Sequence, residues 1–100
     1  MCYSQGTTMI KTFKNKDMEN FYSGKRVAKW QAIQKQAERR LQILDDSTCL
    51  ADLRNLPSNH FEALHGKRSG QYSIRINSQW RICFKWMDNE PHDVEIIDYH

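Results

Sequence analysis

The sequence has little of what membrane-spanning, fibrous or low-complexity proteins need. Only 4 of its 100 residues are glycine and 2 are proline. No apolar run approaches the roughly 20 residues that a membrane-spanning helix requires. Residues 1–8 also lack the apolar stretch of a secretory signal peptide. We therefore expect a cytoplasmic protein with no membrane partner.

Patterns that bind metals or form a disulfide framework are missing as well. The three cysteines, Cys2, Cys49 and Cys83, are an odd number and contain no CxxC pair. The four histidines form no HxxxH or HExxH motif. We expect reduced thiols, no metal and no cofactor.

What remains is the composition of one packed domain. Hydrophobic residues make up 39% of the chain and aromatic residues 11%, which is enough for a core. A chain of 100 residues is too short for two independent cores. We expect a single domain over residues 9–100, preceded by a flexible extension at residues 1–8.

The first half of the chain has helical periodicity. After a short apolar stretch at residues 9–13, which suggests a strand, Asp17 is a candidate N-cap and Gly24 a stop for a short helix. Apolar residues then recur at steps of three and four over residues 27–44, which predicts a longer helix with a charged outer side.

The second half has the period of strands. Apolar and polar residues alternate over residues 72–76 and 80–86, with further strand-like segments at 61–64 and 94–99. Helices followed by a meander predict an α+β fold, a small antiparallel sheet with two N-terminal helices packed on one face.

The register of the central hairpin follows from its hydrophobic residues. Ile76 and Trp80 share the buried face only if they oppose each other, which leaves a three-residue turn at 77–79. In that register Arg75 lies directly opposite Arg81, on the face without helices.

Two arginines across a ladder repel each other, so this pair needs an explanation. Residues 65–85 hold five basic residues and no acid. One interpretation is that an anion such as a phosphate binds between Arg75 and Arg81. The other is that Glu62 or Asp98, on neighbouring strands, neutralises them.

Three motifs together carry a family resemblance. The segments GKRSGQYSIRI at 66–76, WRICF at 80–84 and DYH at 98–100 resemble the HigB-like branch of the RelE/ParE toxin superfamily. The stretch MIKTF at 9–13 resembles the opening of that family, so the resemblance covers residues 9–100. It implies the RelE-like microbial RNase fold and a toxin of a type II toxin–antitoxin pair.

The resemblance also implies an activity and partners. Members of this family are metal-independent endoribonucleases that cleave mRNA on the ribosome, with the ribose 2′-OH as internal nucleophile, and so inhibit translation. The implied partners are the ribosome with mRNA and a helix-turn-helix, HigA-like antitoxin encoded next door. The implied location is the bacterial cytoplasm.

Catalytic roles carry over by motif position. His100 is the candidate acid or base, with Asp98 as the residue that orients it. Arg81 and Arg68 are phosphate clamps, and Tyr99 stacks on a base or contacts a phosphate.

A second set of residues carries over as substrate or phosphate contacts. In two of them this chain departs from the family, because His65 stands where relatives commonly have lysine and Glu62 where some have a catalytic histidine. His60 and His92 match no motif position, and we expect both in loops. The substrate and phosphate contacts are Arg75, Lys67, His65 and Glu62.

Two other functions fit the same resemblance. One is a ParE-like toxin that binds DNA gyrase and cleaves no RNA. The other is a relic that binds its antitoxin and cuts weakly, since the site has fewer cations than usual. The DYH ending and the paired arginines favour the nuclease.

Overall fold

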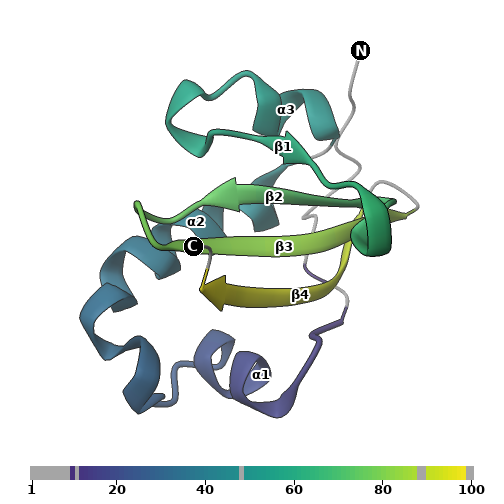
Figure 1. Ribbon diagram of the computed structural model, residues 1–100. Coiled ribbons are helices and arrows are strands. Elements are labelled where there is room, and N and C mark those ends of the chain that lie inside the picture. Colours follow the sequence, from purple (N-terminus) through teal and green to yellow (C-terminus); the bar gives the residue numbers. More distant parts are fainter. Residues whose placement is uncertain (1–9, 11, 48, 88–89, 99–100) are drawn as a thin grey trace.

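The computed structural model describes residues 10, 12–47, 49–87 and 90–98 (Figure 1). Helices come first along the chain and an antiparallel sheet follows. The predicted α+β fold class is confirmed. The elements are α1 (Lys16–Tyr22), η1 (Ala28–Ile33), α2 (Gln34–Asp46), α3 (Leu50–Arg54), η2 (Pro57–Asn59), β1 (Glu62–Ala63), η3 (Gly66–Arg68), β2 (Gln71–Arg75), β3 (Trp80–Met87) and β4 (Glu90–Asp98).

The sheet has the strand order β1-β2-β3-β4, and neighbouring strands are antiparallel. Arg75 pairs with Arg81, and the Ile76 amide donates to the Trp80 carbonyl at 2.9 Å. The predicted register is therefore confirmed. The turn is fixed by Asn77, whose side-chain oxygen accepts from the amides of Gln79 at 2.8 Å and Trp80 at 2.9 Å.

One face of the sheet packs against the helices. Figure 1 shows α2 crossing behind the strands. Alternate strand residues are buried in a common core with residues from α1, η1 and α2, as their periodicity predicts. This core includes Met18, Phe21, Trp30, Ala37, Leu41, Leu44, Ile74, Ile82, Phe84, Val94 and Ile96.

The helix starts differ from those predicted. The N-cap of α1 is Asn15, whose side chain accepts from the Met18 amide at 2.9 Å, and not Asp17. The second helix begins as the 3-10 turn η1, and α2 starts only at Gln34. Val27, which precedes η1, has no side chain that can cap a helix, and the chain enters this helix through 3-10 turns instead.

Two predictions concern the N-terminal part of the chain: a flexible extension at residues 1–8 and a short strand at residues 9–13. The extension at residues 1–8 lies outside the described residues, as do residues 9 and 11 of the predicted first strand. Within the described residues, Phe13 forms an isolated parallel bridge with Val94 of β4.

The expectation of three reduced thiols is wrong. Cys49 is disulfide-bonded, whereas Cys83 is free and buried. In the part of the chain that the structure describes, no helix is both long and apolar enough to cross a membrane.

The carboxylate of Asp45 in α2 links α1 to the segment before it through hydrogen bonds with Tyr22 and Ile10. The Tyr22 hydroxyl donates to one oxygen of Asp45, and the Ile10 amide donates to the other at 2.9 Å. Burial, together with the Asp45 carboxylate, raises the pKa of Tyr22 to about 12. Because this is above the ordinary value of about 10, the fold favours the neutral phenol. Its contribution to stability is complete below about pH 10 and falls as the pH rises towards 12.

We expect Tyr22→Phe to lower the free energy of unfolding near neutral pH by about 1 kcal/mol, because Asp45 loses a donor. The variant's stability should also fall less between about pH 10 and pH 12 than that of the wild type. Urea unfolding across this range measures both effects. Parallel pH curves for the two proteins would contradict the assignment.

Candidate nucleic-acid site on the outer face of the sheet

The strand residues that alternate with the core point to the other side of the sheet, which we call the outer face. Four strands bring them together, because Glu62 pairs with Ser73, Ser73 with Cys83, and Cys83 with Glu95. The outer face includes Glu62, Gln71, Ser73, Arg75, Arg81, Cys83, Lys85, His92, Glu95 and Ile97.

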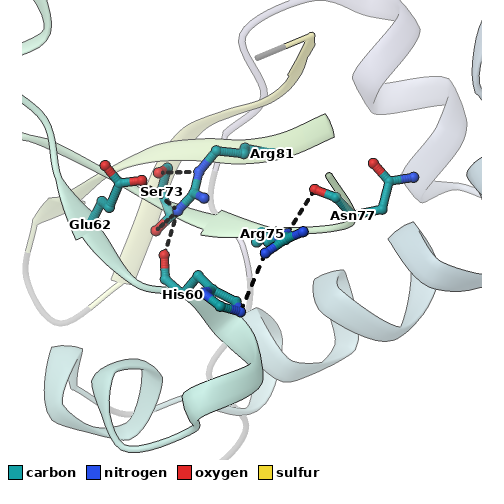
Figure 2. A network of polar contacts seen from close by, with 6 residues as sticks. All are labelled: His60, Glu62, Ser73, Arg75, Asn77 and Arg81. Carbon is teal, nitrogen blue, oxygen red and sulfur yellow. Dashed lines mark hydrogen bonds and ion pairs between the residues drawn. The ribbon is translucent and has the colours of Figure 1, made fainter. Parts of the chain in front are cut away.

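Arg81 is buried on this face, with 6% of its surface exposed. Its Nε donates to the Ser73 hydroxyl at 2.9 Å, and its Nη2 donates to the His60 carbonyl (Figure 2). The same Nη2 lies 3.3 Å from Oε1 of Glu62. The interpretation that a carboxylate neutralises the arginines is therefore confirmed for Arg81 and Glu62. Arg81 ties β3 to the segment that enters β1.

Arg68 is more accessible. It ends η3, and its Nη1 lies 3.0 Å from Oε2 of Glu95 and 3.2 Å from Oε1 of Gln71. The hydrogen bond with Glu95 raises the pKa of Arg68. Its side chain is 42% exposed, so an incoming anion can reach this guanidinium without a change of fold.

Cys83 lies between these two ion pairs. Burial raises the pKa of its thiol to about 11, while the nearby charges of Arg68 and Glu95 act on it in opposite directions. The thiol is therefore neutral near pH 7, and a neutral thiol is a poor nucleophile. Cys83 is part of the framework of the site.

Arg75 differs from the other two arginines in its partners. Its Nε donates to the Asn77 carbonyl at 3.1 Å, and its Nη1 lies 3.5 Å from Nε2 of His60. Among the described residues, Arg75 forms no ion pair with a carboxylate. Figure 2 shows the guanidiniums of Arg75 and Arg81 turned towards different partners, although the residues oppose each other in the ladder.

The other predicted site residues lie around this face or beyond the described residues. His65 and Lys67 are exposed beside η3. Asp98 ends β4 opposite Trp80, and its Oδ2 accepts from the Gln79 side chain at 3.2 Å. Tyr99 and His100 lie outside the described residues. No group of three or more metal-ligating side chains occurs where the structure is described.

Two histidines have surroundings that the sequence did not indicate. His92 lies in β4 opposite Lys85, so the prediction of a loop is wrong, because β4 begins at Glu90 and not near residue 94. Its Nε2 is buried, with no hydrogen-bond partner in the described part. His60 follows η2 in a loop, as predicted, but its carbonyl and its ring each meet an arginine. The register of β3 and β4 is the signal that could have placed His92.

A small antiparallel sheet with N-terminal helices packed on one face is the RelE-like fold. Two solved structures share the fold. The YoeB-YefM complex from Staphylococcus aureus matches with a TM-score of 0.56 and 18% identity, over 93% of this chain and 99% of that one. The YoeB/ParE toxin from Agrobacterium tumefaciens matches with a TM-score of 0.50 and 18% identity, over 91% and 99%.

Sequence similarity narrows the class. The family described as the RelE-like toxin of type II toxin-antitoxin system HigB matches residues 11–100. The chain is 39% identical to Toxin HigB-1 of Vibrio cholerae serotype O1 over 82 residues, which are 80% of this chain and 86% of that protein. It is 31% identical over 94 residues to Endoribonuclease HigB of Proteus vulgaris, covering 92% and 100%. The chain belongs to the HigB-like toxins of type II toxin–antitoxin systems.

Proposed function

We propose that this toxin is a metal-independent endoribonuclease that cleaves mRNA on the translating ribosome. The observation that carries the proposal is the partly exposed guanidinium of Arg68 on the outer face, held by side chains alone. The relative from Proteus vulgaris, which is similar over 92% of the chain, is named an endoribonuclease. Together these favour a phosphodiester as the ligand of this face.

In the proposed reaction the RNA supplies its own nucleophile. The ribose 2′-oxygen attacks phosphorus, the bond from phosphorus to the 5′-oxygen breaks, and the products carry a 2′,3′-cyclic phosphate and a 5′-hydroxyl. The proton of the 2′-hydroxyl leaves to a base or to water, and the departing 5′-oxygen gains one from an acid. Arg68 stabilises the charge on the nonbridging oxygens, because a guanidinium fork matches a phosphate.

The remaining roles follow the family resemblance. We assign His100 as the acid, Asp98 as the residue that orients it, and Tyr99 as the contact to a base or phosphate. Arg81 keeps the site in shape through its buried contacts. Ribosomal positioning of the RNA supplies the geometry that a small site does not.

The proposed partners are the ribosome with its mRNA and a helix-turn-helix antitoxin of the HigA-like kind. The similar structure from Staphylococcus aureus is, by its title, a complex of YoeB with YefM. An adjacent reading frame for a small helix-turn-helix protein would support the second partner. We place the toxin in the bacterial cytoplasm, where translation occurs.

The test is induction of the toxin in growing cells, followed by mapping of mRNA 5′ ends. We expect growth arrest with new ends inside translated regions, and neither effect with His100→Ala. Purified toxin should cut mRNA on translating ribosomes and leave the same RNA intact without them. Equal cleavage of free RNA would contradict ribosome dependence.

The alternatives give different outcomes. Growth arrest without new mRNA ends, together with inhibited supercoiling by gyrase, would replace the nuclease with a ParE-like binding toxin. Continued growth with intact antitoxin binding would indicate the relic.

A further inference from the structure

The backbone of His60 is held in an unusual conformation. His60 has a φ of 45°, in the left-handed region that few L residues adopt unless their surroundings hold them there. Arg81 donates to its carbonyl. The preceding residue, Asn59, is fully buried, donates to the Leu53 carbonyl at 3.0 Å and accepts from Arg40 at 2.9 Å. These contacts therefore fix the backbone of His60 and the point from which its side chain extends.

The ring lies beside Arg75, with Nε2 at 3.5 Å from Nη1 of the guanidinium (Figure 2). His60 is exposed and Arg75 is half-buried, so solvent reaches the pair. Neither residue has an ion-pair partner among the described residues, whereas Arg68 and Arg81 each hold a glutamate. An uncompensated guanidinium beside an imidazole is a place where an anion can bind without displacing a carboxylate.

Charged groups reach this pair from several elements. Arg75 comes from β2, and Arg81 from β3 contacts the carbonyl of His60. Glu62 of β1 is turned to Arg81, and Arg40 of α2 contacts Asn59 and Ser58. The surroundings are cationic, apart from one carboxylate that is already paired.

We propose that His60 and Arg75 form a subsite for a second phosphate of the RNA backbone, on the same face of the sheet as Arg68 but towards the other end of β2. The choice of RNA rests on the proposed function. A guanidinium only donates, so Arg75 and the His60 ring can share a hydrogen bond only when Nε2 carries no proton. Once the ring is protonated, both groups are donors, and a phosphate that accepts from both relieves their repulsion. Binding of RNA at this subsite therefore strengthens as the pH falls.

The test measures binding without cleavage. The probe is a fluorescent 2′-O-methyl oligoribonucleotide, which lacks the nucleophile, and anisotropy gives its affinity for the full chain at about pH 6 and about pH 8. His60→Asn removes the ring but keeps the carbonyl that Arg81 uses, and asparagine tolerates left-handed backbone. Arg75→Gln removes the guanidinium, and Arg26→Gln, at an exposed position outside this face, is the matched control for lost charge.

We expect wild-type toxin to bind the probe more tightly at the lower pH. His60→Asn should weaken binding about tenfold there and reduce the pH difference, and Arg75→Gln should weaken it about tenfold at both values. Each lost phosphate contact should also lower the salt slope of the affinity by about 0.7. Arg26→Gln should leave the pH difference unchanged.

The outcomes separate this subsite from the proposed function. Wild-type affinity and pH dependence in both His60→Asn and Arg75→Gln would overturn the subsite, even if mRNA is cut as proposed. A toxin that shows these binding losses and cuts no mRNA would leave the subsite standing and overturn the nuclease. Weaker capture of the antitoxin by the variants, with unchanged probe binding, would assign the surface to the antitoxin and overturn the RNA subsite.

Discussion

Arg81→Gln is expected to lower the free energy of unfolding by about 3 kcal/mol. The guanidinium is buried and holds the Ser73 hydroxyl, the His60 carbonyl and the Glu62 carboxylate. A glutamine is too short to reach all three partners, so buried polar groups lose their hydrogen bonds. For a domain of 100 residues, the melting temperature should fall by roughly 10–20 °C.

Arg75→Gln is the matched control, because Arg75 lies directly opposite Arg81 in the ladder. Its contacts are the Asn77 carbonyl and the ring of exposed His60, so we expect its melting temperature to stay within a few degrees of wild type. Arg81→Lys should also be destabilised, since one ammonium cannot replace a planar fork. Thermal unfolding followed by circular dichroism measures all three variants. Equal stability of Arg81→Gln and Arg75→Gln would contradict a structural role for Arg81.

The register behind this comparison could be predicted from the sequence because strand side chains have a strict period of two. A slip of one residue between the strands would put Ile74 and Ile82 on opposite faces, so the hydrophobic pattern leaves one solution. The start of α1 could not be predicted in the same way. Both Asn15 and Asp17 are good N-cap residues, and the Lys14 amide, which donates to the Val94 carbonyl at 2.9 Å, fixes where the chain turns into the helix.

The sequence also predicted which face carries the arginines, but not how deeply each is buried. Alternation assigns a side chain to a face and says nothing about what crosses over it. Arg81 is buried because the segment around His60 lies against it, and that segment is fixed by contacts of Asn59 with Leu53 and Arg40. The contacts of Arg40 with Asn59 and of Arg81 with His60 join residues 19 and 21 positions apart in the sequence, so no local pattern predicts them.

The opposite behaviour is expected for Arg68, which is partly exposed and paired with Glu95. Exposed ion pairs contribute only about 0–1 kcal/mol to stability, so Arg68→Ala should unfold close to the wild-type temperature. If Arg68 contacts the scissile phosphate, the same variant should cut mRNA on programmed ribosomes about 10²–10³-fold more slowly, a loss typical of a missing charge-stabilising donor. The cleavage rate of Arg68→Lys should lie between those of wild type and Arg68→Ala, because lysine keeps the positive charge but lacks the planar guanidinium.

Glu95→Gln separates binding from folding at the same position. The carboxylate holds Nη1 of Arg68 at 3.0 Å, so the phosphate has to take its place when RNA binds. Without that negative charge, Arg68 is free for the phosphate, and the 2′-O-methyl probe should bind more tightly than it does to wild type. Single-turnover cleavage measures the rate of Arg68→Ala, and anisotropy measures the affinity of Glu95→Gln for the probe. Two outcomes would contradict the proposal that the phosphate replaces Glu95 as the partner of Arg68. One is cleavage by Arg68→Ala at the wild-type rate, and the other is weaker binding of the probe by Glu95→Gln.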